Sequence, residues 1–346
     1  MNESSTLYEW NSRAGLIKAD TYLELQIKTA LEFVTKSFAV YLPLGILGNV
    51  VSFLVTTTKE NRRISTCVYM SALAAMDSMV LLALASYMFL WTFGLGFSLD
   101  ESTIAKVHLF IWYSANTFGM SSGIFLALMS IDRAIVVQFP LKARTICTPS
   151  SAKKALSFFF VPALININFF FTFKVHKDKL TGAITEILYH PDPPWVETVV
   201  GLYILIVGTA IPFIIIISCN ILIIINVQGA NRRRNKMAAE SKMAAPRGDG
   251  GSHLTRILIV VSLAYLILSV PLRVSDLVFK LPIVQDDYDM DVDYWNLRYN
   301  LIRNCLFIPW TMNYAANFYL YLLCGGKNFR NDTLNVLFCC FRKKTK

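Results

Sequence analysis

The stretch from Gly119 to Val137, GMSSGIFLALMSIDRAIVV, is apolar over most of its length and ends in the adjacent pair Asp132 and Arg133. Its length is close to the roughly 20 residues that a membrane-spanning helix needs. A carboxylate and a guanidinium side by side at a bilayer edge are costly, so their presence indicates a function.

The rest of the chain predicts that this stretch is one of seven membrane spans. Of 346 residues, 55% are hydrophobic and only 16% are charged, which is less charge than a soluble domain of this length carries. The apolar blocks lie near 32–58, 66–94, 104–138, 152–173, 195–227, 253–281 and 299–323. The ten-residue alternation of a membrane barrel is absent from them. We therefore predict an all-α membrane protein, a seven-transmembrane helix bundle that forms one domain over residues 32–323.

The charges of the predicted loops indicate the orientation of the bundle. Basic residues follow the odd-numbered spans, at Lys142 and Arg144 and at Arg232 to Arg234, whereas residues 286–293 on the other side are acidic. The positive-inside rule then predicts an extracellular N-terminal tail (1–31) and a cytoplasmic C-terminal segment (324–346). The net charge of +10 is read as a topology signal and not as a sign of nucleic-acid binding.

Both terminal segments carry predicted features. Asn2 begins a glycosylation sequon on the predicted outer side. After Gly325-Gly326, which should break the last span, residues 328–338 form an amphipathic stretch suited to the membrane interface. Cys339 and Cys340 follow it beside a basic cluster, a context typical of palmitoylation, although two ordinary reduced thiols remain the alternative.

The predicted outer loop 174–194 has the pattern of a β-hairpin. Residues 173–179 and 183–189 flank Leu180-Thr181-Gly182, which reads as a turn.

Short motifs along the chain point to one family. They are Gly48-Asn49-Val50, Leu73 to Asp77, Ser130 to Ala134 with Phe139-Pro140-Leu141 after it, Pro212 and Pro271, and Asn313, Asn317 and Tyr321. In this order and spacing, over about residues 35–340, the chain resembles the rhodopsin-like (class A) G-protein-coupled receptors. The resemblance implies a plasma-membrane receptor that binds an extracellular ligand and activates a heterotrimeric G protein, with arrestin as a further partner.

Several positions depart from the family pattern. Ala134 replaces a tyrosine, Phe318 a proline, Ser269 a tryptophan and Asn220 a tyrosine. The cysteine that ties the third span to the second outer loop is replaced by His108, and that loop has no cysteine. From these departures we expect a looser resting state with some ligand-free signalling.

A carboxylate at mid-membrane depth, Asp77, must be protonated, paired or bound to an ion. Ser122 lies eleven residues before Arg133 and so near the depth of Asp77. With Asn313 and Asn317 these residues offer one charge and several neutral oxygens. In the family such a group holds sodium in the resting state, and a hydrogen-bonded core without an ion is the alternative.

The resemblance also implies the residues that change on activation. Asp132 holds Arg133 at rest, and Arg133 is then released toward the G protein. Pro212 and Pro271 remove backbone hydrogen bonds and so serve as hinges or as static kinks. Asn220 and Tyr321 complete this predicted set.

The ligand pocket is expected among the outer halves of spans three, five, six and seven. Ala115 and Thr311 exclude an amine receptor and an opsin, which need an aspartate and a lysine there. The remaining candidates are Trp112, Asn116, Arg273, Asp276, Arg303 and Asn304. Arg273 and Asp276 are three residues apart and could pair, whereas an unpaired Arg303 would anchor an acidic or amidated group of the ligand.

The departures leave two ligand classes open. The ending Asn317-Phe-Tyr-Leu-Tyr321 and the basic inner loop resemble invertebrate neuropeptide receptors, which we favour. The missing disulfide resembles small-molecule chemosensory receptors. A transporter is a remote alternative because the prolines do not recur symmetrically. An enzyme is not expected, since the four histidines all fall at span ends or in loops.

Overall fold

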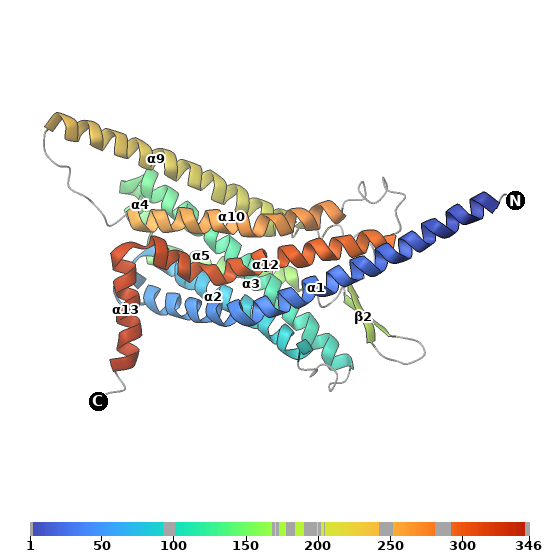
Figure 1. Ribbon diagram of the computed structural model, residues 1–346. Helices are drawn as coiled ribbons and strands as arrows, with labels where there is room; N and C mark the ends of the chain where they lie inside the picture. Colours follow the sequence, from blue (N-terminus) through green and yellow to red (C-terminus); the bar gives the residue numbers. More distant parts are fainter. Residues whose placement is uncertain are drawn as a thin grey trace. The chain divides into compact units, whose positions relative to one another are not determined.

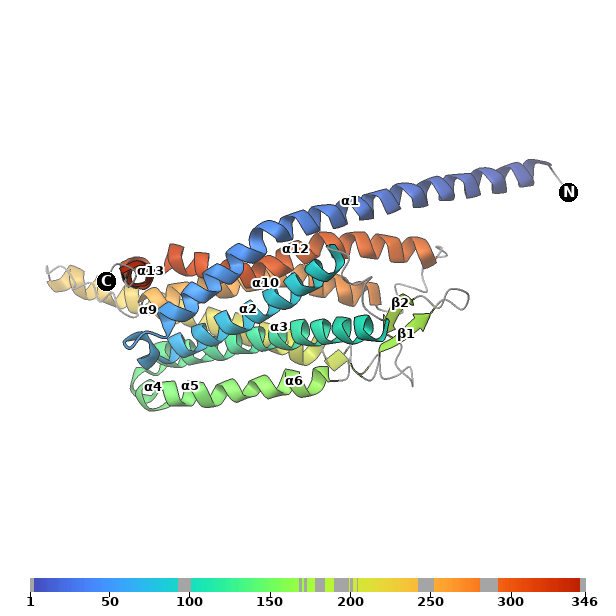
Figure 2. The same ribbon diagram turned by 90° about the horizontal axis from the view of Figure 1, so that it is seen from below.

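The computed structural model describes residues 3–92, 101–167, 170, 173–177, 184–189, 199, 202–203, 205–241, 252–280 and 292–342 (Figures 1 and 2). The chain forms two compact units, each described by itself below. One comprises Met1–Tyr41 with Ile267–Met312, and the other Leu42–Leu266 with Asn313–Lys346.

Long helices cover six of the seven predicted blocks. They are α1 (Glu3–Thr56), α2 (Ser65–Thr92), α3 (Glu101–Gln138), α9 (Ile211–Ser241), α10 (Ser252–Lys280) and α12 (Val292–Cys324). A short 3₁₀ turn, η1 (Asn61–Arg63), lies between α1 and α2. The helix α1 begins at Glu3 and therefore runs through the segment expected to be an extracellular tail.

The fourth predicted block is divided into short helices. After α4 (Pro140–Ile146), the chain continues through α5 (Pro149–Ala155), η3 (Leu156–Phe159) and α6 (Phe160–Asn166), which follow one another alongside α3 (Figure 2). The Thr148 side chain caps α5 by accepting from the Ser151 amide at 3.1 Å. Pro162 cannot donate to the carbonyl of Phe158 and crowds it, which explains the 3₁₀ geometry of η3.

Five of the described helices are long and apolar enough to cross a membrane. They are Glu32–Thr56, Ser65–Leu90, Lys106–Gln138, Ile206–Ala230 and Leu254–Asp276. The fourth predicted span falls short because its helices are interrupted. The helix α12 is long enough, but Arg303, Asn313 and Asn317 lower its mean hydropathy.

A π-helical turn, η4 (Ile206–Ala210), precedes α9. Pro212 lies two residues after this turn and lacks the N–H that would bond the carbonyl of Gly208. A widened turn at this place accommodates the proline, and such turns are frequent at functional sites.

The predicted hairpin is confirmed. Strands β1 (Phe173–Lys177) and β2 (Ile184–Tyr189) pair antiparallel, with Phe173 opposite Tyr189 and an irregularity between His176 and Lys177.

The larger unit has an apolar core between α2, α3, α9 and α10. Its fully buried side chains include Met70, Leu73, Met129, Ile216 and Leu258. Large apolar residues on the outer faces of the same helices are exposed, for example Ile214, Ile225 and Leu263, which suits helices that face lipid.

Two glycines allow α1 and α12 to approach closely. A Cβ on Gly45 would lie 2.6 Å from the Cβ of Ala315, and one on Gly48 would lie 2.9 Å from the Cβ of Phe318. Phe318 thus packs on Gly48 at the position where the family pattern has proline. The Asn49 side chain adds a hydrogen bond to the Tyr314 carbonyl at 2.9 Å.

The chain turns sharply after α12 into α13 (Gly326–Arg342), which confirms the predicted break and terminal helix (Figure 1). A Cβ on Gly325 would lie only 2.4 Å from the Tyr321 carbonyl oxygen, so this turn requires glycine. Arg330 bonds the carbonyls of Leu322 and Leu323, and Asp332 accepts from Asn61 of η1 at 3.0 Å.

In the smaller unit, the N-terminal part of α1 packs on α12. The buried Phe38 ring contacts that of Phe307, and the hydroxyls of Tyr41 and Thr311 are hydrogen-bonded.

Candidate functional site

The Asp77 carboxylate of α2 is fully buried and receives hydrogen bonds from two other helices. The Ser122 hydroxyl of α3 donates to Oδ1 at 2.6 Å, and Nδ2 of Asn317 on α12 donates to Oδ2 at 2.6 Å. The fourth residue of the predicted group, Asn313, is also buried. Three of the four predicted residues are therefore in direct contact.

The same residues have a suitable set of oxygens for sodium, because a hard cation prefers carboxylate, hydroxyl and amide oxygens. In the described arrangement, however, Asn317 turns its nitrogen toward Asp77, and both carboxylate oxygens receive donors. This is the hydrogen-bonded core that the sequence left as the alternative. An ion would need the Asn317 amide turned over, and sodium binding stays a prediction.

Tyr321 lies one helical turn beyond Asn317. It is buried, its ring contacts Phe329 of α13 edge to face, and its hydroxyl has no partner among the described residues. A buried hydroxyl without a hydrogen-bond partner is unfavourable. A rearrangement of the helices that gave the Tyr321 hydroxyl such a partner would therefore be stabilised by the new hydrogen bond.

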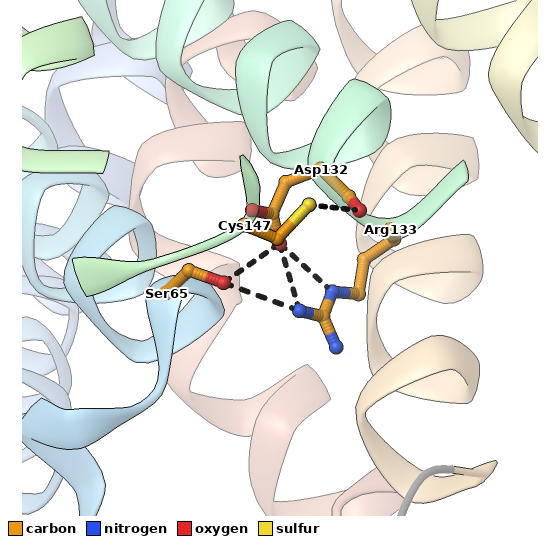
Figure 3. A network of polar contacts seen from close by, with 4 residues as sticks. All are labelled: Ser65, Asp132, Arg133 and Cys147. Carbon is orange, nitrogen blue, oxygen red and sulfur yellow. Dashed lines mark hydrogen bonds and ion pairs between the residues drawn. The ribbon is translucent and has the colours of Figure 1, made fainter. Parts of the chain in front are cut away.

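Asp132 and Arg133 form a buried ion pair at the end of α3 (Figure 3). The Arg133 Nη2 and Nε atoms lie 2.7 and 3.1 Å from Asp132 Oδ2. The arrangement is the closed pair that the sequence predicts for the resting state. Charge-assisted hydrogen bonds of this kind are stronger than neutral ones.

Two residues that the sequence did not single out join this pair. The Ser65 hydroxyl of α2 lies 2.9 Å from Asp132 Oδ2 and 3.3 Å from Arg133 Nη2. The Cys147 thiol, between α4 and α5, donates to the Asp132 carbonyl at 3.5 Å (Figure 3). Burial and the Asp132 carboxylate raise the pKa of Cys147 to about 11, so the thiol is protonated at neutral pH.

Asn220 links α9 to α10. Its side chain is buried, and Nδ2 donates to the Ser262 hydroxyl at 2.8 Å. Pro212 lies at the start of α9 and Pro271 inside α10. The hydrogen bond between Asn220 and Ser262 therefore joins the two proline-containing helices. It lies on the C-terminal side of Pro212 in α9 and on the N-terminal side of Pro271 in α10.

The predicted ligand residues of α3 are held within their own unit. Trp112 lies in an aromatic cluster with His108 and Tyr87, at ring distances of 6.1 and 6.2 Å. Asn116 donates to the Trp112 carbonyl at 2.9 Å. His108 thus packs against rings at the position where the family has a disulfide cysteine.

The contacts of the predicted ligand residues on α10 and α12 contradict the expectation that Arg303 is unpaired. Arg303 is not unpaired, because its Nε lies 3.5 Å from Asp276 Oδ1, which also accepts from the Tyr299 hydroxyl at 2.8 Å. Arg273 does not take Asp276 as the alternative proposed, since its guanidinium lies 5.5 Å from the centre of the Trp310 ring. The predicted pairing of Arg273 with Asp276 was wrong because it considered the residues of one helix only, whereas Asp276 pairs with a residue of another helix.

The sixth predicted ligand residue, Asn304, is half-buried on α12. Trp112 and Asn116 belong to the larger unit and the other four to the smaller one, so a common pocket stays a prediction.

Some predicted residues lie outside the described parts. Asn2 and most of the acidic segment 286–293 are among them, as are the side chains of Cys339 and Cys340. Glycosylation and palmitoylation therefore stay predictions.

Residues 48–324 match the model of the 7 transmembrane receptor (rhodopsin family). The chain belongs to this receptor family. The receptor is thus a multi-pass membrane protein with seven spans, and it is not an enzyme.

The receptor is similar to three curated relatives. It is 24% identical to the FMRFamide receptor of Drosophila melanogaster over 322 residues, which cover 85% of this chain and 52% of that one. It is 24% identical to somatostatin receptor type 4 of Rattus norvegicus, over 89% and 74% of the two chains. It is 30% identical to the thyrotropin-releasing hormone receptor of Mus musculus, over 45% and 37%. The receptor thus spans about half or less of the length of two of these relatives.

Proposed function

We propose that this receptor binds an extracellular peptide and activates an intracellular heterotrimeric G protein. In this proposal it lies in the plasma membrane with its N-terminus outside and its C-terminus in the cytoplasm, and arrestin is a further partner.

The observation that carries the proposal is the buried pair of Asp132 and Arg133. Both side chains are shielded from water, and a buried charge is stable only while it is paired and hydrogen-bonded. The pair can thus hold one arrangement of the helices, and an alternative arrangement must supply Arg133 with another partner. A ligand that prefers one arrangement then shifts the populations by its difference in affinity.

The relatives support a peptide as the ligand, since FMRFamide, somatostatin and thyrotropin-releasing hormone are all peptides. The smaller unit supplies groups that suit one. Arg303 and Asp276 are 35% and 25% exposed and could bind charged or amide groups, and Arg273 lies over an aromatic ring. Because Arg303 is already paired, a ligand must compete with Asp276 for its guanidinium.

A small-molecule ligand is the second candidate, supported by the cluster of Tyr87, His108 and Trp112. Three adjacent rings provide a flat and largely apolar surface that would suit a compact aromatic compound.

The test is G-protein activation in intact cells that express the receptor, challenged with amidated peptides and their free-acid forms. We expect a response at nanomolar peptide in wild-type cells and none in Arg133→Ala cells with equal surface density. A matched control is Lys36→Ala, which removes an exposed charge from α1. A response only to small aromatic compounds would favour the second candidate, and silence of a surface-exposed receptor toward both classes would refute the ligand assignment.

A further inference from the structure

The Ser65 hydroxyl lies between the two partners of the buried ion pair. It donates to Asp132 Oδ2 at 2.9 Å and accepts from Arg133 Nη2 at 3.3 Å. A hydroxyl has one proton to donate and lone pairs to accept, so it can make both contacts at once. Ser65 is itself buried at the start of α2.

Within the part of the chain that the structure describes, this bridge is the polar contact that ties the pair to α2. Asp132 and Arg133 are neighbours on α3, and an ion pair between them does not by itself connect α3 to another helix. Within the described residues, the side-chain hydrogen bonds of Asp132 converge on Oδ2, which receives Nε and Nη2 of Arg133 and the Ser65 hydroxyl. Cys147 makes a second connection, from the segment after α4 to the Asp132 carbonyl.

The helix α10 does not offer Arg133 a carboxylate. Along its described residues, 252–280, the first acidic residue is Asp276, and the turn at its start carries His253 and Arg256 instead. Within the described residues, Arg133 forms its ion pair with Asp132. Among the residues that the structure describes, the hydrogen bond that links Arg133 to another helix is therefore the one to Ser65 of α2.

We propose that Ser65 is a positioning residue that keeps Asp132 and Arg133 closed by anchoring them to α2, while Cys147 bonds the Asp132 backbone beside the pair. Separation of the start of α2 from the end of α3 removes the bridge, so that Asp132 alone holds Arg133 and its release becomes easier. The inference rests on the proposed function only in that a freed Arg133 promotes signalling.

The first test is Ser65→Ala. Without its hydroxyl the closed arrangement loses two hydrogen bonds to charged groups, so ligand-free signalling per surface receptor rises roughly threefold to tenfold. Ser65→Thr retains the hydroxyl and signals as the wild type does. The matched control is Ser71→Ala on the same helix, because the Ser71 hydroxyl bonds the Val68 carbonyl of its own helix.

If Ser65→Ala impaired folding, the surface density of the receptor and its signalling would fall, whereas the proposal predicts a rise in signalling. If Ser65→Ala does not reach the surface, Ser65→Val is compared with Ser65→Thr, which has nearly the same shape and differs by one hydroxyl. In an Asp132→Asn background Ser65→Ala adds little, because the two substitutions disrupt the same contact.

The second measurement does not need a G protein. Membranes are treated briefly with a maleimide, and the modified fraction of Cys147 is determined by mass spectrometry. We expect labelling several-fold faster in Ser65→Ala than in wild type or Ser71→Ala, because the thiol leaves the Asp132 carbonyl when the closed arrangement opens.

The two measurements together separate the possible failures. If Cys147 is labelled faster in Ser65→Ala but neither this variant nor the wild type signals, the Ser65 anchor is supported and the proposed function is rejected. Unchanged labelling would overturn the role of Ser65. In a wild-type receptor that does signal, ligand-free signalling of Ser65→Ala that is unchanged or lower at equal surface density would also overturn it.

Discussion

Replacing Gly45 by alanine tests the close approach of α1 and α12. The added Cβ would lie 2.6 Å from the Cβ of Ala315, 2.8 Å from Cδ1 of Leu81 and 2.9 Å from Cα of Ala315, where ordinary contacts are 3.4–4 Å. The helices must therefore move apart by about 1 Å, and such overpacking typically costs about 1–3 kcal/mol. Alanine recovers about 0.5–1 kcal/mol through its higher helix propensity, which leaves a net loss of about 0.5–2 kcal/mol.

The assay is thermal unfolding of the detergent-solubilised receptor. A loss of this size lowers the melting temperature by about 1–8 °C if each kcal/mol shifts it by about 2–4 °C. Gly229→Ala is the matched control, because its Cβ would meet only Arg233, at 3.8 Å, and it should raise the melting temperature slightly.

Ala315→Gly removes the nearest contact of the new methyl group. The loss of stability in the double variant Gly45→Ala/Ala315→Gly should therefore be smaller than the sum of the two single losses by at least about 0.5 kcal/mol. A Gly45→Ala receptor that melts at or above the wild-type temperature, or single effects that simply add, would refute the close packing.

Three further predictions concern the polar contacts. If sodium binds at Asp77, replacing Na⁺ by choline lowers the melting temperature of the wild type but not of Asp77→Asn; equal melting of the wild type in both salts would indicate the hydrogen-bonded core. Asn220→Ala and Ser262→Ala should each destabilise the receptor by about 1 kcal/mol, and the double variant by little more, in chemical or thermal unfolding; additive losses would reject their hydrogen bond. Arg303→Gln should cost less than about 1 kcal/mol, because its ion pair with Asp276 is partly exposed to water, but it should weaken ligand potency tenfold or more if the guanidinium anchors the ligand; unchanged potency would remove Arg303 from the ligand site.

The long helices could be predicted because their causes are local. A block of about 20 apolar residues must satisfy its backbone hydrogen bonds internally in a membrane, and a helix does so with partners four residues away. The same applies to the hairpin, whose two paired strands are close in sequence, and to the break at Gly325, where only glycine leaves room for the Tyr321 carbonyl.

The interruptions within the fourth and fifth spans show where local reasoning was incomplete. Pro162 and Pro212 were visible in the sequence, but whether a proline produces a kink, a 3₁₀ turn or a π-helical turn depends on how the freed carbonyl is accommodated. That depends on the neighbouring helices. At η4, Gly208 lies against Met120 of α3, which is contact information that the sequence does not contain.

The family, the helical class and the relative depths of Asp77, Ser122 and Asn317 could be predicted from the residue order, because depth along a helix follows from residue spacing. The partners across helices could not: Ser65 for Asp132 and Arg133, Ser262 for Asn220, and Asp276 for Arg303. The difference is geometric. Spacing sets the height of a side chain along the membrane normal, whereas its partner depends on the rotation and packing of each helix, which many distant contacts set together.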